Sequence, residues 1–427
     1  VTLEALIKLF GDELFVKLPK FKAMMIEPMN NLNKNISELS AKEGQEIIDS
    51  FELNKTVFPW IDTKLKDEIL SNVDVILKGL NSKESVFRYA SSKCFASIVD
   101  SCPNVGFELL VKNILPMLNN PHDVSQRQGA VECIYHVVQF MDSSILPYIV
   151  FLIVPILGRM SDSNRDIRLI ATATFAQIIK LVPLESGIPD PVDMPASLLE
   201  GRQKEREFLS QMMDPSKIEP FEMPVSIKAT LRKYQQEGVN WLFFLNKYHL
   251  HGILCDDMGL GKTLQTICMV ASDHHMRSEK FAKDRSIESR KLPSLIVCPP
   301  SLTGHWEQEF QQYAPFMKVI VYAGPPSARA QLKKQIENGV KDDIDIVITS
   351  YDIVRNDVDF VTKFDYNYCV LDEGHIIKNA KSVLSKCVKQ VKAEHRLLLS
   401  GTPIQNNVVE LWSLFDFLMP GFLGTYK

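Results

Sequence analysis

Apolar residues recur about three or four positions apart, the spacing of an amphipathic helix, from the start of the chain to about Pro183. Three segments of this region align on one another when Arg88, Arg127 and Arg168 are superposed. At equal distances after each arginine come a small residue and two large apolar ones: Ser91, Phe95 and Ile98; Ala130, Ile134 and Val137; Ala171, Phe175 and Ile178. The pattern predicts an all-helical region with internal repeats over residues 1–184.

A period of roughly 40 residues with paired helices resembles HEAT repeats, in which each helical pair buries its apolar face by stacking on its neighbours. We interpret residues 1–184 as the C-terminal part of a longer, HEAT-like solenoid. An irregular helical bundle with chance self-similarity is the alternative, because three degenerate copies are few.

The pattern changes after residue 184. Residues 185–225 are rich in Pro, Asp, Glu and Met and contain one charged helical stretch, which is typical of a bridge between domains. From residue 226 to 427, short apolar runs alternate with helical ones, which predicts an α/β domain with a parallel sheet and helices on both faces. The predicted strands are Gly252–Asp256, Leu295–Pro299, Val319–Tyr322, Ile344–Thr349, Tyr368–Asp372 and Arg396–Ser400.

One polar segment, His274–Pro293, interrupts this alternation. Its charges are of both signs, so we predict a solvated surface insertion. Contact of this segment with DNA is the alternative, although blocks of a single sign would carry a stronger signal.

The first predicted strand runs directly into a loop and then a helix, the context that a phosphate-binding loop requires. Strand end and loop read Asp256-Asp257-Met258-Gly259-Leu260-Gly261-Lys262-Thr263. Glycines allow backbone amides to wrap a phosphate, the lysine reaches phosphate oxygens, and the threonine hydroxyl binds magnesium. Asp256 stands where the consensus has its first glycine, so the loop alone also fits a turn that binds no nucleotide.

A second motif is the pair of carboxylates, Asp372 and Glu373, that ends the apolar run from Tyr368. At such a place an Asp can hold the magnesium shell and a Glu can orient and deprotonate the attacking water. An isolated acidic pair is more often a helix cap or exposed turn. Because this pair follows the phosphate loop by about 110 residues within one α/β unit, we predict Lys262, Asp372 and Glu373 as catalytic residues, and Thr263 and Asp372 as magnesium ligands.

Four further segments occur in order with these two motifs. They are Leu231-Arg232-x-Tyr234-Gln235, Val297-Cys298-Pro299-Pro300-Ser301-Leu302-x-x-x-Trp306, Thr349-Ser350-Tyr351 and Leu399-Ser400-Gly401-Thr402-Pro403. The whole succession, from about Ser226 to the last residue, resembles the Swi/Snf-like ATPases of helicase superfamily 2. The resemblance implies that residues 226–427 are the first of two RecA-like lobes.

The same resemblance implies roles for individual residues and two cofactors, ATP and Mg²⁺. Gln235 would read the adenine edge, and the other nucleotide-binding residues would be Asp257, Met258, Gly259, Leu260, Gly261, Lys262, Thr263 and Leu264. The residues that would touch a DNA backbone are Pro300, Ser301, Leu302 and Ser350. Those that would couple the nucleotide to DNA are His375, Ser400, Gly401 and Thr402. We interpret Trp241, Trp306 and Trp412 as packing residues.

Helical repeats ahead of a lobe with Asp-Glu-Gly-His at positions 372–375 narrow the resemblance to ATPases associated with TATA-binding protein. This implies a nuclear protein that translocates on double-stranded DNA and displaces TATA-binding protein, whose main contact surface would lie in earlier repeats. The chain starts at Val1, so we expect it to be part of a longer protein. A second lobe would supply an arginine finger, worth roughly 10³–10⁵ in rate, without which turnover is poor.

Composition restricts the classes further. The chain has 427 residues, 45% of them hydrophobic, and a net charge of -4, so several folded domains are expected and bulk charge does not argue for nucleic-acid binding. The 8 cysteines form no C-x-x-C motif, which predicts a reducing compartment and no zinc site. The longest apolar run, Ile145–Leu157, contains two prolines and is too short for a membrane span.

Three functions fit these observations. A DNA-translocating motor uses all of the predicted catalytic residues and is favoured. A nucleotide-gated interaction scaffold with little turnover would not need Lys262, Asp372 and Glu373 together. A chromatin remodeller shares the ATPase motifs but not the HEAT-like repeats. The motifs serve unwinding helicases as well, and we expect translocation without strand separation.

Overall fold

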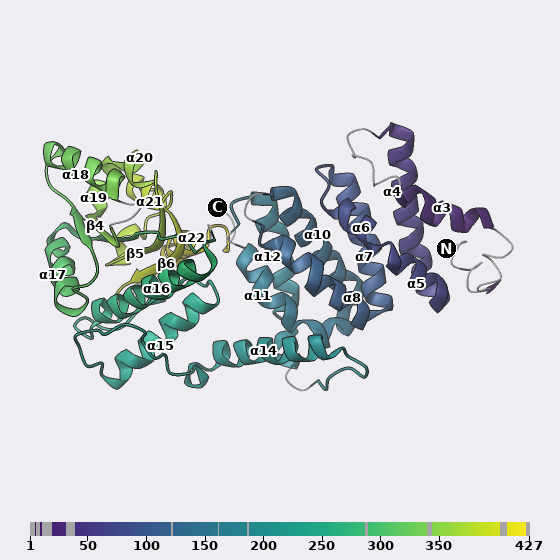
Figure 1. Cartoon of the computed structure of the whole chain (residues 1–427), viewed down its shortest axis with the longest axis horizontal. Coiled ribbons are helices and arrows are strands. Elements are labelled where there is room, and N and C mark those ends of the chain that lie inside the picture. Colours follow the sequence, from purple (N-terminus) through teal and green to yellow (C-terminus); the bar gives the residue numbers. More distant parts are fainter. Residues whose placement is uncertain are drawn as a thin grey trace. The chain divides into compact units, whose positions relative to one another are not determined.

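The computed structural model describes residues 5, 9–10, 19–30, 39–120, 123–160, 162–185, 188–286, 289–339, 344–401 and 408–423. The chain divides into two compact units, Val1–Met212 and Met213–Lys427. The division falls inside the segment predicted as a bridge, residues 185–225. Each unit is described separately below (Figure 1).

All the regular secondary structure described in the first unit is helical. Its α-helices are α3 (Pro19–Asn30), α4 (Ala41–Val57), α5 (Thr63–Ser71), α6 (Val73–Leu80), α7 (Ser85–Ser101), α8 (Pro103–Leu109), α9 (Leu115–Leu118), α10 (Val124–Met141), α11 (Val150–Arg159), α12 (Arg165–Ile178), α13 (Val182–Glu185) and α14 (Ala196–Met213). A π-helical turn, Leu110–Ile114, joins α8 to α9, and a 3₁₀ segment, Asp142–Tyr148, follows α10. Helix α10 packs against α7 and against α12, and α7 in turn packs against α4 (Figure 1).

The three arginines that align in the sequence occupy equivalent places near the starts of α7, α10 and α12. The Arg88 guanidinium donates to the carbonyls of Ser82 and Lys83, 3.0 and 2.9 Å away. The Arg127 guanidinium donates to the Asn120 carbonyl at 2.7 Å, and that of Arg168 donates to the carbonyls of Asp162 and Ser163. Each arginine therefore satisfies carbonyls of the turn before its own helix. The identification of the helices in residues 1–184 as HEAT repeats stays a prediction.

The second unit is a parallel six-stranded sheet in the order β1-β6-β5-β2-β4-β3. The strands are β1 (Gly252–Leu254), β2 (Ser294–Cys298), β3 (Val319–Tyr322), β4 (Ile346–Ser350), β5 (Asp365–Leu371) and β6 (Lys392–Leu399). All six predicted strands are present, and their ends shift by a few residues. The predicted fold class, a helical region followed by a parallel sheet with helices, is confirmed.

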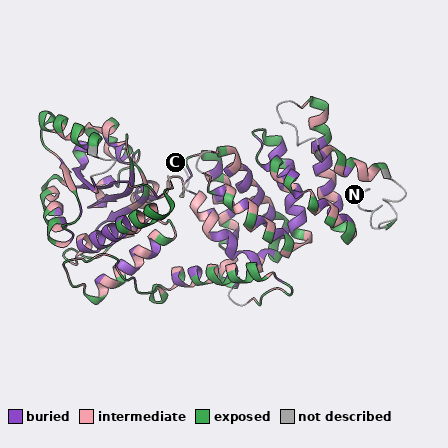
Figure 2. Ribbon diagram, in the orientation of Figure 1, coloured by how far each residue is buried: buried purple, intermediate pink, exposed green. Residues whose placement is uncertain are grey.

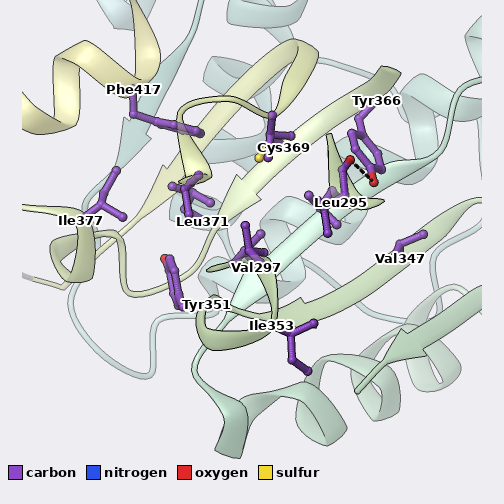
Figure 3. Packing of buried hydrophobic residues seen from close by; sticks show 14 of the residues in the cluster. Leu295, Val297, Val347, Tyr351, Ile353, Tyr366, Cys369, Leu371, Ile377 and Phe417 are labelled. Atoms are coloured by element: carbon purple, nitrogen blue, oxygen red, sulfur yellow. Dashed lines mark hydrogen bonds between the residues drawn. The ribbon is translucent and has the colours of Figure 1, made fainter. Parts of the chain in front are cut away.

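Helices cover both faces of this sheet. They are α15 (Lys233–Lys247), α16 (Lys262–Asp284), α17 (Thr303–Tyr313), α18 (Pro326–Gly339), α19 (Tyr351–Asn356), α20 (Val358–Val361), α21 (Val383–Val388) and α22 (Val408–Leu418). Alternate strand residues enter two separate cores: Leu295 and Val297 lie in one, and Ile296 and Cys298 in the other. Figure 3 shows the first of these cores. The alternation follows from the two-residue period of a strand.

The prediction of a solvated surface insertion at His274–Pro293 is confirmed in the exposure of most of residues 275–285, but the first half of the segment continues a helix and is not an insertion. Helix α16 continues to Asp284, and the His274 side chain is 6% exposed and lies 2.8 Å from the Ser294 hydroxyl. The charged residues that suggested an insertion lie on the exposed C-terminal part of this helix. Figure 2 shows the buried first half of α16 and the buried strands. No helix in the described ranges has both the length and the apolar character needed to cross a bilayer.

Candidate functional site

The sequence motifs of the second unit meet at one end of the sheet, where the strands finish. The strands are parallel, so their carboxyl ends share that edge. The segments that leave them there are 255–261 after β1, Ser400 and Gly401 after β6, Asp372 and Glu373 after β5, Pro300–Leu302 after β2, and Ser350 at the end of β4. This edge, which we call the carboxyl edge, is where open parallel sheets bind ligands.

The loop between β1 and α16 has the backbone of a phosphate-binding turn. Gly259 and Gly261 have φ of +82° and +84°, a left-handed conformation that side chains other than glycine rarely adopt. A Cβ on Gly261 would also lie 2.5 Å from the Gln235 amide nitrogen. The Lys262 ammonium donates to the carbonyls of Asp256 and Asp257, 2.6 and 3.0 Å away. The loop therefore holds its own lysine beside the N-terminus of α16.

Asp256, the residue that departs from the consensus glycine, has a specific partner. Its carboxylate accepts a hydrogen bond from the Gln265 amide at 2.9 Å. The other end of that amide fills space beside Gly238, where a Cβ would lie 1.8 Å from Gln265 Oε1. The missing glycine is thus replaced by a carboxylate that fixes the start of the loop to α16.

Two predicted nucleotide-binding side chains point into the protein. Gln235 is 8% exposed, accepts from the Arg232 amide at 2.9 Å and donates to the Leu260 carbonyl at 3.2 Å. Leu264 is 9% exposed and packs with Val239 and Cys268. By contrast Asp257, Met258 and Gly259 are exposed, and Leu260, Gly261, Lys262 and Thr263 are partly exposed. Gln235 thereby joins the loop to α15.

Asp372 is held by three donors. Its Oδ2 accepts from the Trp306 indole at 2.8 Å, and its Oδ1 accepts from the Glu373 amide at 2.9 Å. The Tyr351 hydroxyl donates to its carbonyl at 2.7 Å. Burial, and the nearby Asp372, raise the pKa of Tyr351 well above its usual value, so this hydroxyl keeps its proton. Glu373 follows with φ of +53°, and its carboxylate lies 3.2 Å from His375 Nδ1.

Ser400 and Gly401 lie directly beside the phosphate-binding loop. The Ser400 amide donates to the Leu254 carbonyl at 3.1 Å, and a Cβ on Gly401 would lie 3.4 Å from Met258 Cγ. The structure therefore brings these two predicted coupling residues, with His375 near Glu373, to the same edge. Thr402, the fourth, lies outside the described residues.

The predicted DNA-contacting residues have different surroundings. Pro300 and Ser301 are exposed, and Leu302 is partly exposed, in a 3₁₀ turn that leads into α17. Ser350 is only 3% exposed, ends β4 beside its paired residue Cys298, and immediately precedes α19. The structure thus presents Pro300–Leu302 at the surface and places Ser350 beneath it.

Sequence reasoning missed three residues of this edge. Trp306 was interpreted as packing, and it is fully buried, but it also holds Asp372. Tyr351 and Gln265 were not considered as site residues. Trp306 and Tyr351 lie inside the quoted motifs, which is the only sequence signal that singles them out.

The donor set suits a magnesium ion held together with phosphates. Magnesium prefers oxygen ligands and usually takes only one or two carboxylates, with water and substrate phosphates completing its shell. The Thr263 hydroxyl at the start of α16 and the Asp372 carboxylate are oxygen donors at the same edge, and each Asp372 oxygen has one protein donor, which leaves acceptor capacity. Within the described ranges, no group of three or more His, Cys, Asp or Glu side chains could hold a metal alone.

The opposite end of the sheet, which we call the amino edge, holds a second polar cluster. The Asp273 carboxylate accepts from the amides of Asn246 and Asn367, 3.0 and 2.6 Å away. Asn246 also contacts the Tyr368 hydroxyl and His395 Nε2. Burial lowers the pKa of His274 and of His395 to about 4, and burial followed by the nearby Arg396 lowers that of His251 to about 3.

Comparison with known proteins matches the second unit to one domain family. The family described as SNF2-related domain matches residues 234–427. The chain is also similar over its whole length to TATA-binding protein-associated factors. It is 55% identical to MOT1 of Saccharomyces cerevisiae over 429 residues, which is 100% of this chain and 23% of that protein. It is 44% identical to factor 172 of Homo sapiens, over 100% of this chain and 23% of that protein.

Two further similarities cover about half of the chain. Helicase SWR1 of Debaryomyces hansenii is 39% identical over 225 residues, 52% of this chain and 13% of that protein. A structure of the Sulfolobus solfataricus SWI2/SNF2 ATPase core in complex with dsDNA is 37% identical, covers 48% of this chain and 39% of that chain, and has a TM-score of 0.40. The chain thus spans under a quarter of the length of the first-named factors.

Proposed function

We propose that this chain, which carries an SNF2-related domain and is similar over its whole length to the TATA-binding protein-associated factors MOT1 and factor 172, is the first ATPase lobe and adjoining helical part of a nuclear motor. The motor translocates on double-stranded DNA and uses ATP to displace TATA-binding protein from it. The observation that carries the proposal is that the phosphate loop, the Asp372-Glu373 pair and Ser400-Gly401 adjoin one another at the carboxyl edge.

The residues of this edge divide the work of hydrolysis. Backbone amides of the loop and the Lys262 ammonium bind the β- and γ-phosphates, with Gln235 and Leu264 supporting the loop from inside. Glu373 orients the attacking water and takes its proton. Thr263 and Asp372 would hold Mg²⁺, which would supply positive charge to the phosphate oxygens. An arginine from a second lobe of the longer protein completes the site.

DNA contact is assigned to Pro300, Ser301 and Leu302, and Ser350 acts from below the surface at the neighbouring strand end. His375, beside Glu373, and Ser400 to Thr402 connect the nucleotide to this segment. Coupling of this kind lets DNA binding change the geometry around Glu373.

The partner is assigned from the extent of the similarity. The MOT1-type factors match the helical unit as well as the lobe, whereas helicase SWR1 matches about half of the chain. A remodeller that shares only the ATPase lobe would give the second pattern. We therefore propose TATA-binding protein as the displaced protein and place most of its contact surface in a part of the protein that precedes this chain.

The test is release of labelled TATA-binding protein from a promoter duplex by the longer protein. We expect release that requires ATP hydrolysis, no separation of the DNA strands, and no comparable action on histone octamers. Release driven equally by a non-hydrolysable analogue would support the scaffold alternative. Preferential action on octamers would support the remodeller.

A further inference from the structure

We propose that Trp306 is a positioning residue that fixes the Asp372 carboxylate and connects it to the DNA-facing segment Pro300–Leu302. The inference rests on the proposed function, because it assigns Asp372 to magnesium and Pro300–Leu302 to DNA. It adds a residue and a physical connection between the two.

The contact is buried and specific. The Trp306 side chain is 0% exposed and Asp372 is 9% exposed, and the indole nitrogen lies 2.8 Å from Asp372 Oδ2. An indole N–H can only donate, and a buried one needs an acceptor. A backbone carbonyl would satisfy that need equally well. Here the acceptor is one oxygen of the carboxylate that we assign to magnesium.

The two donors to Asp372 act on different oxygens. The Glu373 amide occupies a site on Oδ1, and the indole occupies one on Oδ2. Together they set the rotation of the carboxylate about its last bond, so the remaining lone pairs have fixed directions. Partners that orient metal ligands in this way typically change metal affinity by about 10–100-fold when they are removed.

The ring of Trp306 is fixed by the core rather than by the site. Trp306 and Phe310, both on α17, pack in one core with residues of α16, and their ring centroids are 6.2 Å apart. A phenylalanine at position 306 would fill much of the same space. The core therefore explains an aromatic residue here, and the bond to Asp372 explains a tryptophan.

Trp306 is also close in sequence to the DNA-facing segment Pro300–Leu302, because only residues 303–305 lie between them. The 3₁₀ turn Pro300–Leu302 leads directly into α17, and the Thr303 hydroxyl donates to the Pro300 carbonyl at 3.0 Å. Leu302 packs against the same core as Trp306. A displacement of the turn by DNA would be carried by the first turn of α17 to the indole and so to Asp372.

The first test measures binding rather than turnover. Fluorescently labelled ADP is titrated onto the 427-residue chain at increasing Mg²⁺ concentration, for wild type and Trp306→Phe. We expect the Mg²⁺ concentration for half-maximal nucleotide binding to rise about 10-fold in Trp306→Phe. The control is Phe310→Leu, which disturbs the same core but keeps the indole N–H, and its Mg²⁺ requirement should stay within about twofold of wild type.

Each outcome has a distinct meaning. An unchanged Mg²⁺ requirement in a folded Trp306→Phe chain overturns the role of Trp306 and leaves the proposed function intact. Equal shifts in Trp306→Phe and Phe310→Leu overturn it too, because packing alone would then explain the effect. If the wild-type chain binds nucleotide equally well with and without Mg²⁺, both the role of Trp306 and the proposed function are overturned.

The second test addresses the connection to DNA in the longer protein. Adding a DNA duplex should lower the Mg²⁺ requirement of wild type, and this shift should disappear in Trp306→Phe. Persistence of the full shift in Trp306→Phe would overturn the connection.

Discussion

The two edges of the parallel sheet carry polar residues of the same types but use them differently. At the carboxyl edge, Asp257 and Gly259 are exposed, Lys262 is partly exposed, and the Asp372 oxygens retain acceptor capacity. At the amino edge, Asp273 is as buried as Asp372 and likewise has one donor on each oxygen, but the residues around it, Asn367, Tyr368 and His395, are buried too. The carboxyl edge therefore presents exposed groups to a ligand, whereas the cluster at the amino edge is enclosed by the protein.

The exposure of the neighbouring residues therefore distinguishes the two edges, whereas residue type, burial of the carboxylate and its number of hydrogen bonds do not. A buried carboxylate that is fully paired stabilises one fold, and removing it leaves donors without acceptors. A carboxylate at the same end of the sheet as an exposed glycine loop can also take part in binding a ligand. The following predictions test this separation.

The largest effect is expected at the carboxyl edge, for Glu373→Gln. Loss of a general base typically costs about 10²–10⁴-fold in rate. In the longer protein we expect DNA-stimulated ATP hydrolysis to fall by that amount, with nucleotide affinity nearly unchanged. Steady-state hydrolysis and nucleotide titration measure the two quantities. A fall of less than about 10-fold would remove Glu373 from the role of base.

At the amino edge the large effect should be on stability. Asp273→Ala deprives the Asn246 and Asn367 amides of an acceptor, so we expect the free energy of unfolding to drop by roughly 2–5 kcal/mol. Asp352→Ala is the matched control, because its side chain is 59% exposed and pairs with Arg355 on the surface. That change should cost less than about 1 kcal/mol. Equal losses in urea denaturation would contradict the distinction between the edges.

The pH dependence of stability should also come from the amino edge. His274 and His395 have pKa values of about 4 in the folded protein, below the usual value of 6.5, so the unfolded chain binds more protons between these pH values. The stability that comes from keeping these two histidines neutral is therefore fully present above pH 6.5 and is lost as the pH falls towards 4. Each such histidine contributes a slope of up to about 1.4 kcal/mol per pH unit.

The variant His395→Phe tests this origin. It keeps an aromatic ring beside Tyr368, whose ring centroid is 4.8 Å from that of His395, but removes the titrating group. We expect a shallower loss of unfolding free energy between pH 6.5 and pH 4, measured by denaturant titration at several pH values. A slope identical to that of wild type would show that His395 does not titrate as described.

The smallest effects distinguish two glycines. Gly261→Ala forces a left-handed residue and brings Cβ to 2.5 Å from Gln235, so a loss of about 1–2 kcal/mol and weaker nucleotide binding are expected. Gly304→Ala lies in α17 with nothing within 4 Å and should raise stability by up to about 1 kcal/mol. Thermal unfolding of both variants measures the difference. A stabilised Gly261→Ala would contradict the loop geometry.

Much of the fold could be predicted because its signals are local. The apolar runs gave all six strands, and glycines with a following Lys262 and Thr263 marked the loop. The carboxylate pair was predictable because it ends an apolar strand. Parallel strands then bring such ends together, so the composition of the edge followed from the motifs.

What the sequence could not reveal depends on contacts between distant residues. His274 looked like part of a charged surface segment, and only the fold pairs it with Ser294. Asp256 departs from the consensus of the loop, and only the fold reveals that Gln265 holds its carboxylate. Trp306 looked like packing because its bond to Asp372 joins residues 66 positions apart. Hydropathy patterns carry no information on such partners.

The most direct test of the central claim compares one lysine from each edge in a nucleotide titration. Lys262 lies in the loop at the carboxyl edge, and Lys291 pairs with Asp345 at the amino edge, 2.9 Å away. We predict that Lys262→Ala weakens binding of Mg²⁺-ATP by about 10–100-fold, since it removes a charged hydrogen bond to phosphate, and that Lys291→Ala leaves it unchanged. Equal affinities of the two variants would contradict the assignment of the nucleotide to the carboxyl edge.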